Sequence, residues 1–273
     1  MRKMILLALF IAALFLTFST GIAEETMRID FLNVGKADAI IIAKDPYTIV
    51  IDTGTNAQGK VLVRELQDRG CKSVDLLIIT HYDKDHVGGA DKLISSIPVK
   101  QILVPAYTST SKQTTQFFDA VDEFRVPCEQ LNENRTLMMD DMKLVIDIAN
   151  ERDYGEDEEN DFSLVTSLFF GKCSFLFAGD AENPRLGELL SEEIGHHDVL
   201  KVPHHGQAEK LSAAFFEAVS PRHAVITSDT KELEDAAVVR FLESAGTKVW
   251  LTREGTVTCT CDGENIRFSQ SRP

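Results

Sequence analysis

Residues 81–86 read His-Tyr-Asp-Lys-Asp-His, and four of these six side chains are of types that bind metal ions. The segment directly follows residues 76–80, Leu-Leu-Ile-Ile-Thr, an apolar run that predicts a buried strand. Because a packed strand fixes where the next loop begins, that loop can direct several side chains at one point. The fold must therefore bury a strand that ends at a metal site, whose first candidate ligands are His81, Asp83, Asp85 and His86.

Two further apolar runs are followed by residues of the same types. Residues 174–178 precede a Gly-Asp pair that contains Asp180, and residues 199–202 precede Pro-His-His-Gly, which contains His204 and His205. Three buried strands that each end in such residues indicate one shared metal site. The alternative is an acidic surface loop with two incidental histidines, beside a histidine pair that only forms hydrogen bonds.

The hydrophobic pattern predicts an α/β chain in which early strands are followed by strands interleaved with helices. Strands are predicted over residues 28–34, 39–43, 48–52, 76–80, 101–104, 142–148, 163–170, 174–178, 199–202 and 223–227, and near Val249, Val257 and Ile266. Helices are predicted over residues 60–69, 90–96, 114–124, 185–193, 212–219 and 235–245. This order fits two packed sheets with helices outside them.

Several segments together resemble the metallo-β-lactamase superfamily, in particular its ComEC-like competence-protein branch. The superfamily motif HxHxDH appears here as HxDxDH, with Asp83 at the second position, a variant typical of that branch. Further segments similar to this branch are residues 31–39 (FLNVGKADA), 51–54 (IDTG), 160–165 (NDFSLV) and 200–206 (LKVPHHG).

This resemblance implies an αββα sandwich, in which two packed mixed sheets are flanked by helices and the site lies at one edge between the sheets. It also implies the ligand sets: His81 and Asp83 for a first ion, and Asp85 and His86 for a second. Asp180 would bridge the two ions, and either His204 or His205 would complete the second set. Asp85 is also the candidate catalytic residue, which would accept a proton or orient the attacking water.

The chain departs from the superfamily pattern at its third motif, where the usual histidine is absent. Residues 153–161 occupy that place, and Asp161 or Asn160 could supply an oxygen ligand or contact the substrate; the alternative is an acidic surface loop. We therefore expect one or two divalent ions, zinc first and manganese second, and no organic cofactor. Asp52 ends a predicted strand and is expected either to hydrogen-bond the metal loop or to serve as an ordinary turn residue.

The N-terminal segment has the pattern of a signal peptide. A basic start over residues 1–3 precedes the apolar residues 4–18, and small residues before Ala23 suit cleavage there. We expect residues 1–23 to be a signal peptide or an N-terminal anchor, and residues 24–273 to form one hydrolase domain. The domain is therefore expected to be secreted, or tethered to the membrane if the segment is not cleaved.

The formal net charge of −15 constrains the partners of the domain. Affinity for nucleic acid depends largely on Lys and Arg contacts to phosphates, so tight binding of duplex DNA is not expected. The five cysteines are too few and too scattered to form a disulfide framework. We expect no membrane channel domain of the kind that ComEC carries, and the sequence leaves the oligomeric state open.

These features favour a secreted metal-dependent hydrolase of phosphodiesters, acting on a small molecule or a nucleic acid through a metal-activated water. One alternative is hydrolysis of a lactone, a β-lactam or another acyl substrate on the same fold. Another is a non-catalytic binding module that has kept the fold.

Overall fold

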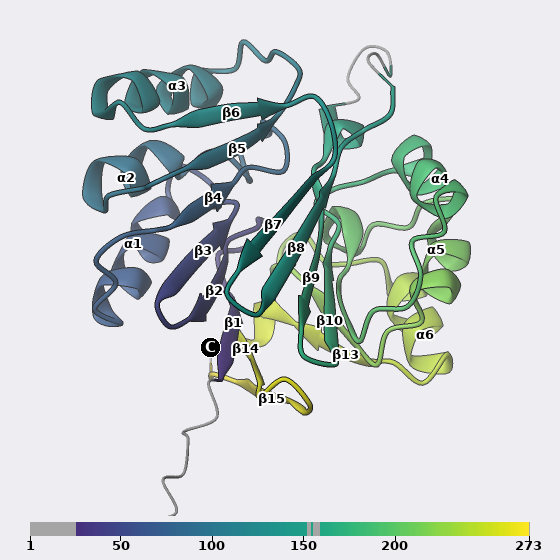
Figure 1. Cartoon of the computed structure of the whole chain (residues 1–273). Helices are drawn as coiled ribbons and strands as arrows, with labels where there is room; N and C mark the ends of the chain where they lie inside the picture. The colour runs from purple at the N-terminus through teal and green to yellow at the C-terminus, as the bar shows by residue number, and fades with distance from the viewer. Residues whose placement is uncertain (1–25, 152–153, 155–158, 273) are drawn as a thin grey trace, which may run out of the picture.

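The computed structural model describes residues 26–151, 154 and 159–272, which form two packed β-sheets between two layers of helices (Figure 1). The first sheet has eight strands in the order β15-β14-β1-β2-β3-β4-β5-β6. Their bounds are β1 Met27–Phe31, β2 Ile40–Lys44, β3 Tyr47–Ile51, β4 Leu76–Ile78, β5 Ile102–Pro105, β6 Cys128–Leu131, β14 Val257–Cys261 and β15 Ile266–Gln270.

The second sheet has seven strands in the order β13-β12-β11-β10-β9-β8-β7. Their bounds are β7 Arg135–Met139, β8 Met142–Asp147, β9 Val165–Phe170, β10 Cys173–Phe177, β11 Val199–Lys201, β12 His223–Ile226 and β13 Lys248–Leu251. Both sheets are mixed: β3 to β6 pair in parallel in the first and β10 to β13 in the second, whereas the other neighbours are antiparallel.

Helices cover the outer face of each sheet (Figure 1). The first sheet carries α1 Gly59–Asp68, α2 Ala90–Ser96 and α3 Lys112–Phe124, and the second carries α4 Asn183–Ser191, α5 Ser212–Val219 and α6 Ala236–Ser244. The described residues also include three short 3-10 helices, η1 Glu159–Phe162, η2 Pro203–Gly206 and η3 Thr252–Glu254. The architecture is an αββα sandwich, which confirms the fold class predicted from the sequence.

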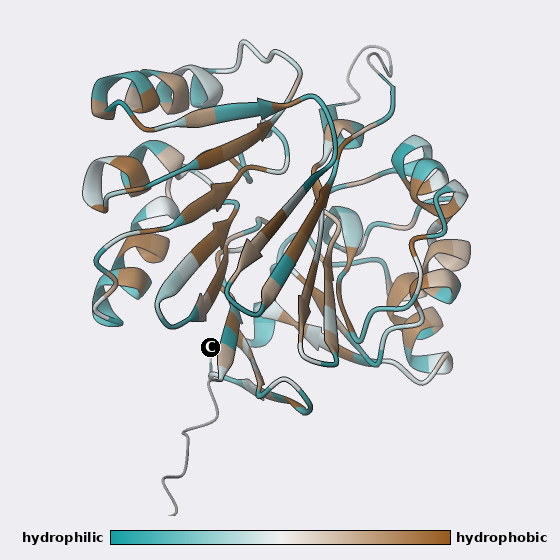
Figure 2. Ribbon diagram, viewed as in Figure 1, coloured by the Kyte–Doolittle hydropathy of each residue, from teal (hydrophilic) through white to brown (hydrophobic). Residues whose placement is uncertain are grey.

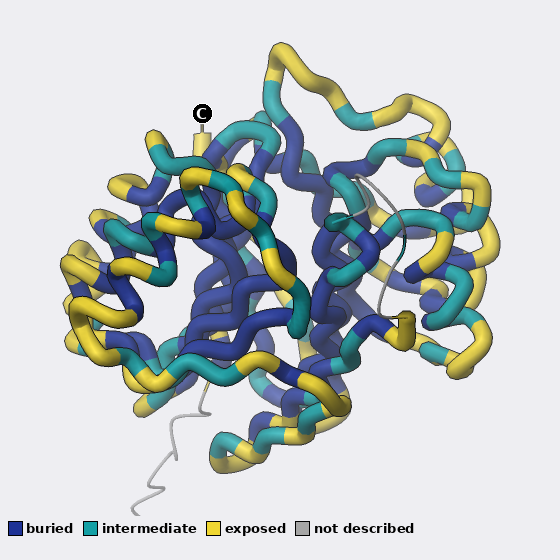
Figure 3. Tube along the Cα trace, turned by 90° about the horizontal axis from the view of Figure 1, so that it is seen from above, coloured by how far each residue is buried: buried dark blue, intermediate teal, exposed yellow. Residues whose placement is uncertain are grey.

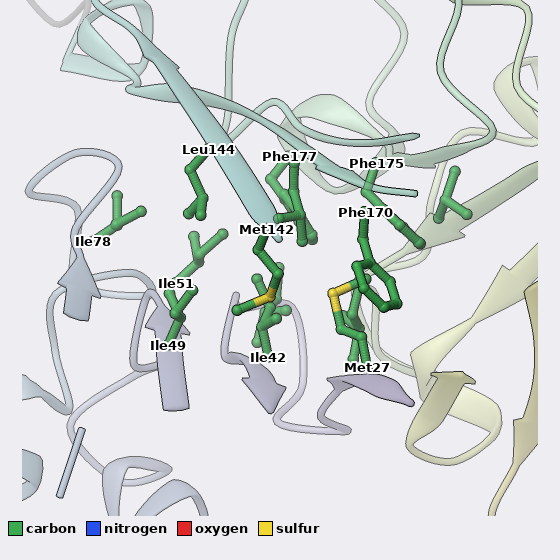
Figure 4. Packing of buried hydrophobic residues seen from close by; sticks show 14 of the residues in the cluster. Met27, Ile42, Ile49, Ile51, Ile78, Met142, Leu144, Phe170, Phe175 and Phe177 are labelled. Atoms are coloured by element: carbon green, nitrogen blue, oxygen red, sulfur yellow. The ribbon is translucent and has the colours of Figure 1, made fainter. Parts of the chain in front are cut away.

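The central core lies between the two sheets (Figure 4). The first sheet contributes Met27, Ile42, Ile49, Ile51 and Ile78, and the second contributes Met142, Leu144, Phe170, Phe175 and Phe177. Each of these side chains is at most 4% exposed. Burying a large apolar side chain contributes roughly 2 kcal/mol, so this layer supplies much of the free energy that holds the sheets together.

Alternate residues of the central strands pack under the helices instead. Leu77 of β4 joins the cluster beneath α1 to α3, and Leu176 of β10 joins the cluster beneath α4 to α6. These strands are therefore buried on both faces, which explains their continuous apolar sequences. Figure 2 shows the apolar strands, and Figure 3 shows that the buried chain lies in the middle while exposed segments lie on the helices and loops.

The start of α2 lies against the start of α1 with no room for side chains. A Cβ atom built on Gly59 would lie 2.6 Å from the Cα of Gly89, and one built on Gly89 would lie 2.4 Å from the carbonyl oxygen of Thr53. Glycine is required where backbones approach this closely. The contact holds the end of the loop 81–89 against the loop that follows β3.

Two strands were not predicted from the sequence. Strand β6 is short and lies at the edge of the first sheet, and β7 lies at the edge of the second and alternates half-buried with exposed residues. Edge strands bury little apolar surface, so their hydrophobic pattern is weak. Residues 163 and 164 were predicted as part of β9, but the strand begins at Val165 and Ser163 lies in the preceding loop.

The predicted signal peptide lies outside the described residues. No helix in the part of the chain that the structure describes is long and apolar enough to span a bilayer. The five cysteines are free thiols, and Cys173, Cys259 and Cys261 are buried.

Candidate metal centre

The carboxyl ends of the parallel strands of both sheets carry the candidate site. Asp52 follows β3, the segment 81–86 follows β4, Asp180 follows β10, His205 follows β11 and Thr227 follows β12. Ligand sites in α/β proteins lie outside the carboxyl ends of strands, because loops leaving neighbouring parallel strands meet there. Residues from both sheets thus converge across the seam between them.

Asp180 lies at the centre of this group. Its Oδ2 atom is 3.2 Å from Nε2 of His86 and 3.0 Å from Nε2 of His205. The rings of His81 and His86 have centroids 4.0 Å apart, and Nε2 of His205 is 3.5 Å from Oδ2 of Asp85. Among the described residues, ligand atoms lie within 4.8 Å of one another in four groups. The two ligand sets at this centre are His81 with His86 and Asp180, and Asp85 with His86 and His205. The other two groups are Asp38 with Asp52 and His86, and Glu182 with His204 and Glu209.

Asp52 orients two of the histidines. Its Oδ2 atom is 2.8 Å from Nδ1 of His86 and accepts a hydrogen bond of 2.7 Å from the Thr80 hydroxyl. Because that hydroxyl donates its only proton to Asp52, it accepts from Nδ1 of His81, 3.0 Å away. Both imidazoles therefore carry their proton on Nδ1 and present the lone pair of Nε2 to the centre.

Asp38 orients the third histidine in the same way. The Thr227 hydroxyl donates to Oδ1 of Asp38 over 2.6 Å and lies 2.9 Å from Nδ1 of His205. The hydroxyl therefore accepts from Nδ1–H, which leaves the lone pair of His205 on Nε2. Residue His205 has a left-handed backbone conformation (φ 51°), which turns its ring inward.

These residues fit a divalent metal ion. The Nε2 atoms of His81, His86 and His205 are buried and make no hydrogen bond. Nε2 of His86 and Nε2 of His205 lie 3.2 and 3.0 Å from a carboxylate oxygen of Asp180, and at that distance a nitrogen lone pair and a carboxylate oxygen need a proton or a metal ion between them. Three imidazoles with carboxylates form the ligand set of zinc and similar divalent ions, and hydrogen bonds that the outer Nδ1–H groups donate, to Asp52 from His86 and to Thr227 from His205, are typical of metal-binding histidines.

The electrostatics of the cluster favour a cation at its centre. Burial raises the pKa of Asp180, but His205, His86 and Lys201 more than offset this and hold it well below its usual range. Burial lowers the pKa of His86 and of His205, yet the Asp180 carboxylate raises both above the usual value. This position therefore attracts protons or a metal ion, and binding of an ion there releases protons.

Asp83 and Asp85 form the partly exposed side of the centre. Burial and the neighbouring Asp85 raise the pKa of Asp83 to about 6. Burial also raises the pKa of Asp85, but the adjacent His205 imidazole and the charge of His86 bring it below its usual value. Among the described residues, Asp83 belongs to neither of the two ligand sets, so its role as a ligand stays a prediction.

The structure separates His204 from His205. The Nδ1 atom of His204 lies 3.2 Å from Oε1 of Glu182 and 3.8 Å from Oε1 of Glu209, outside the cluster around Asp180. Both histidines have left-handed backbones, with φ of 47° and 51°, so successive rings point to different sides. Of the two candidates that the sequence left open, the geometry brings His205 to the centre.

Asp161 and Asn160 are placed at the start of α4. Oδ1 of Asp161 accepts hydrogen bonds from the backbone amides of Glu182 (3.0 Å) and Arg185 (3.2 Å), and the amide of Asn160 donates to Glu182 (2.7 Å). An aspartate that accepts from the first amides of a helix caps its N-terminus. Oδ1 of Asp161, one of the two residues that could supply an oxygen ligand, is therefore engaged in capping. Ser163 approaches the metal loop, with Oγ 3.5 Å from Nδ1 of His81.

Sequence reasoning did not assign roles to Asp38, Lys201, Thr80 or Thr227. The ammonium of Lys201 is buried and lies 2.5 Å from Oδ2 of Asp38 and 3.3 Å from Oδ1 of Asp180. A lysine inside the apolar run of residues 199–202, directly before the histidine pair, was the available signal. A buried charge needs a partner, so such a lysine indicates a nearby carboxylate.

The αββα sandwich with a His and Asp cluster at its seam defines a metallo-β-lactamase fold with a site that fits a divalent metal. A family model described as the Metallo-beta-lactamase superfamily matches residues 32–227, and the chain belongs to this superfamily. Metal-dependent hydrolysis is therefore the general activity that the family and the site support together.

Three relatives place the chain near competence proteins. It is 25% identical over 234 residues to ComE operon protein 3 of Bacillus subtilis, covering 79% of this chain and 30% of that protein. It is 27% identical over 212 residues to Recombination protein 2 of Haemophilus influenzae, covering 76% and 25%. It is 25% identical over 217 residues to Competence protein ComA of Neisseria gonorrhoeae, covering 76% and 28%. The chain thus spans less than a third of each relative, and the predicted ComEC-like resemblance is confirmed.

Two solved structures share the fold. The metallo-β-lactamase fold protein YhfI from Bacillus subtilis has a TM-score of 0.56 and 11% identity, covering 90% of this chain and 100% of that chain. CmlA, a diiron β-hydroxylase from Streptomyces venezuelae, has a TM-score of 0.56 and 13% identity, covering 90% and 54%. At these identities the likeness concerns the fold alone.

Proposed function

We propose that this domain is a metal-dependent phosphodiesterase. One observation carries the proposal: three buried imidazoles, from His81, His86 and His205, present unpaired Nε2 atoms to Asp180, beside the partly exposed Asp85. A bound divalent ion would lower the pKa of a water molecule and polarise a phosphoryl oxygen. We expect zinc first and manganese second, with one or two ions held by the sets around Asp180.

The proposed role of each residue in the site follows from how far its side chain is exposed. The buried imidazoles and Asp180 would hold the ion, and Asp52 and Asp38 would keep the imidazoles in the ion-binding tautomer. Asp85, whose side chain is 22% exposed, is the ligand set's member closest to solvent. It would orient the attacking water and accept its proton, which general-base catalysis requires to happen within hydrogen-bond reach.

The phosphodiester preference rests on two supports. The names of the relatives refer to competence and to recombination, and DNA is a phosphodiester polymer. Asp83 at the second motif position is the variant typical of the competence branch. The net charge of −15 favours a small phosphodiester or a locally bound nucleic acid over tight binding of duplex DNA.

We also propose that the domain acts outside the cytoplasm. The basic start, the apolar residues 4–18 and the small residues before Ala23 support export, with release or tethering decided by cleavage. Fractionation of cells that express the full chain, with detection of a C-terminal tag, tests this: signal only in the cytoplasmic fraction would contradict it.

The test of activity is hydrolysis of bis(p-nitrophenyl) phosphate by zinc- or manganese-loaded protein, measured beside nitrocefin and a lactone. His205→Asn is the informative variant, because the asparagine amide reaches the position of Nδ1 but places no atom at Nε2. It also tolerates a left-handed backbone. His204→Asn is the matched control, since it makes the same change at the adjacent left-handed residue outside the cluster.

We expect phosphodiester turnover that His205→Asn lowers by more than the roughly 10–100-fold typical of an outer hydrogen-bond partner. The turnover of His204→Asn should stay within about threefold of the wild type, because His204 lies outside the cluster around Asp180 and is neither a ligand nor an outer partner there. Turnover of nitrocefin or the lactone alone would replace the proposal with an acyl hydrolase. Bound metal with no turnover of any substrate would replace it with a binding module.

A further inference from the structure

Lys201 is the one buried ammonium that reaches the metal centre among the described residues. Its side chain is 0% exposed at the end of β11, and its three protons meet three acceptors. Nζ lies 2.9 Å from the carbonyl oxygen of Gly179, 3.3 Å from Oδ1 of Asp180 and 2.5 Å from Oδ2 of Asp38. A buried charge with every proton paired has a fixed position, so its partners are fixed as well.

The two oxygens of Asp180 are therefore used differently. Oδ1 faces the ammonium of Lys201, whereas Oδ2 faces the lone pairs of His86 and His205 at 3.2 and 3.0 Å. A carboxylate that bound one ion through both oxygens, or two ions through one oxygen each, would place a cation on Oδ1 beside the ammonium of Lys201, and repulsion between the two charges would favour displacement of Lys201. That change would strand a buried ammonium, which costs several kcal/mol.

Asp38 completes the arrangement from the other sheet. One of its oxygens holds Lys201, and the other accepts from Thr227, which orients His205. Its backbone is also fixed, because the amide of residue 38 donates to the carbonyl of Asp85 and its carbonyl accepts from Gly54. Asp38 thus connects two candidate ligands, Asp180 through Lys201 and His205 through Thr227.

We propose that Lys201, held by Asp38, is a positioning residue that makes Asp180 a one-oxygen ligand through Oδ2. The inference rests on the metal site proposed above and adds how Asp180 binds there. It predicts that ion affinity and coordination number depend on a side chain that touches no ion.

Charge and position must be separated in the test. Removing Lys201 alone would leave the centre one unit more negative and would attract cations more strongly for that reason. The double variant Lys201→Met/Asp38→Asn removes one charge of each sign, so the net charge is unchanged. The asparagine can still accept from Thr227, so the tautomer of His205 is kept.

The matched control is Lys44→Met/Asp141→Asn. Lys44 is also a buried lysine at a strand end, with its ammonium 2.9 Å from Asp141, but this pair lies outside the metal centre. Both double variants remove a buried lysine and its carboxylate partner at a strand end, so the control reports what the loss of such a lysine does away from the metal centre, and thermal unfolding compares the stability that each variant loses. Circular dichroism and thermal unfolding establish that each variant folds.

The readouts are the Kd for Zn²⁺, measured by chelator competition, and the visible spectrum of the Co²⁺-loaded protein, which reports coordination number. We expect Lys201→Met/Asp38→Asn to raise the Kd by about 10–100-fold and to change the Co²⁺ spectrum, as loss of an outer partner does. The control should match the wild type in both. An unchanged Kd and spectrum in the folded Lys201 variant would overturn the inference while leaving the metal site intact.

A second measurement uses the wild type alone. In a crystal structure of the zinc-loaded protein, Oδ1 of Asp180 should remain on Lys201, with only Oδ2 in contact with ions. Contact of both oxygens with ions would overturn the inference even if the variants fail to fold. A wild-type protein that binds no divalent ion would overturn the metal site itself, which distinguishes the two failures.

Discussion

Replacing Asp52 by asparagine should weaken metal binding by changing where one histidine carries its proton. Asp52 accepts three hydrogen bonds: Oδ1 from the Thr80 amide (2.8 Å), and Oδ2 from the Thr80 hydroxyl (2.7 Å) and from His86 (2.8 Å). Asparagine keeps the shape and tolerates the left-handed backbone at residue 52 (φ 56°). Its oxygen can stay on the Thr80 amide, but its NH₂ group then faces Nδ1 of His86. That nitrogen must accept, so the imidazole proton moves to Nε2.

The expected magnitude follows from the bond that is lost. With its proton on Nε2, His86 has no lone pair for an ion, and binding requires moving the proton back against the asparagine NH₂. A hydrogen bond to a charged group contributes about 1.5–3 kcal/mol, and each 1.4 kcal/mol corresponds to tenfold in affinity. We therefore expect the Kd for Zn²⁺ to rise by about 10–100-fold, in line with other outer partners of metal-binding histidines.

The assay is chelator competition with purified protein, supported by circular dichroism. Asp75→Asn is the control: Asp75 also accepts from a backbone amide, that of Thr48 at 2.8 Å, and pairs with Lys100, outside the metal centre. It should leave the Kd unchanged. A folded Asp52→Asn protein that binds Zn²⁺ as tightly as the wild type would refute the tautomer argument.

Three further outcomes concern stability. Burial raises the pKa of Asp30, but hydrogen bonds from Arg28 and Thr258 and the charge of Arg69 bring this pKa below its usual value. The stability that the Asp30 carboxylate contributes is therefore present above about pH 4 and is lost as the pH falls through the lowered pKa. Asp30→Asn should therefore lower the free energy of unfolding by about 3 kcal/mol at pH 7, with the difference shrinking below about pH 4 in urea titrations. Gly89→Ala should lower the free energy of unfolding by about 3 kcal/mol, because the new Cβ would lie 2.4 Å from a carbonyl oxygen. Gly187→Ala within α4 should raise it by about 0.5–1 kcal/mol, because its Cβ would meet its nearest neighbour at 3.5 Å. Equal effects of the two substitutions would contradict the packing argument. Removing a bound ion with EDTA should lower Tm by about 5–10 °C if the ion was present at about 100 times its Kd, and an unchanged Tm would contradict tight binding to the folded state.

The strands that carry the candidate site were predictable because they are buried on both faces. Strands β4, β10 and β11 are largely apolar, and residues of metal-binding types follow each of them within three residues. The edge strands β6 and β7 have one weakly covered side, so their sequences carry little periodicity. Local sequence therefore missed these two edge strands, although it predicted the edge strands at the opposite margins, β13 and β15.

The side-chain partners within the site were less predictable, because they depend on contacts between distant segments. Lys201 meets Asp38 across the two sheets, and Thr227 meets Asp38 over 189 residues of chain. The choice between His204 and His205 depends on the left-handed backbone of both residues, and a His-His pair in a sequence does not predict that conformation. Asp161 was available as a ligand by residue type, yet the helix start at α4 engages its oxygen.

The seam between the sheets gives the hydrophobic core a second role as a spacer. The loop 81–86 belongs to the first sheet, whereas Asp180 and His205 belong to the second, so every distance between these groups depends on how far apart the sheets lie. That separation is set by side chains such as Met142 and Phe175 (Figure 4). A change of core volume that leaves hydrophobicity intact would therefore alter the reactive geometry without touching a polar residue. In this fold, the methionine, isoleucine and phenylalanine side chains of the core therefore help to determine the geometry of the metal centre.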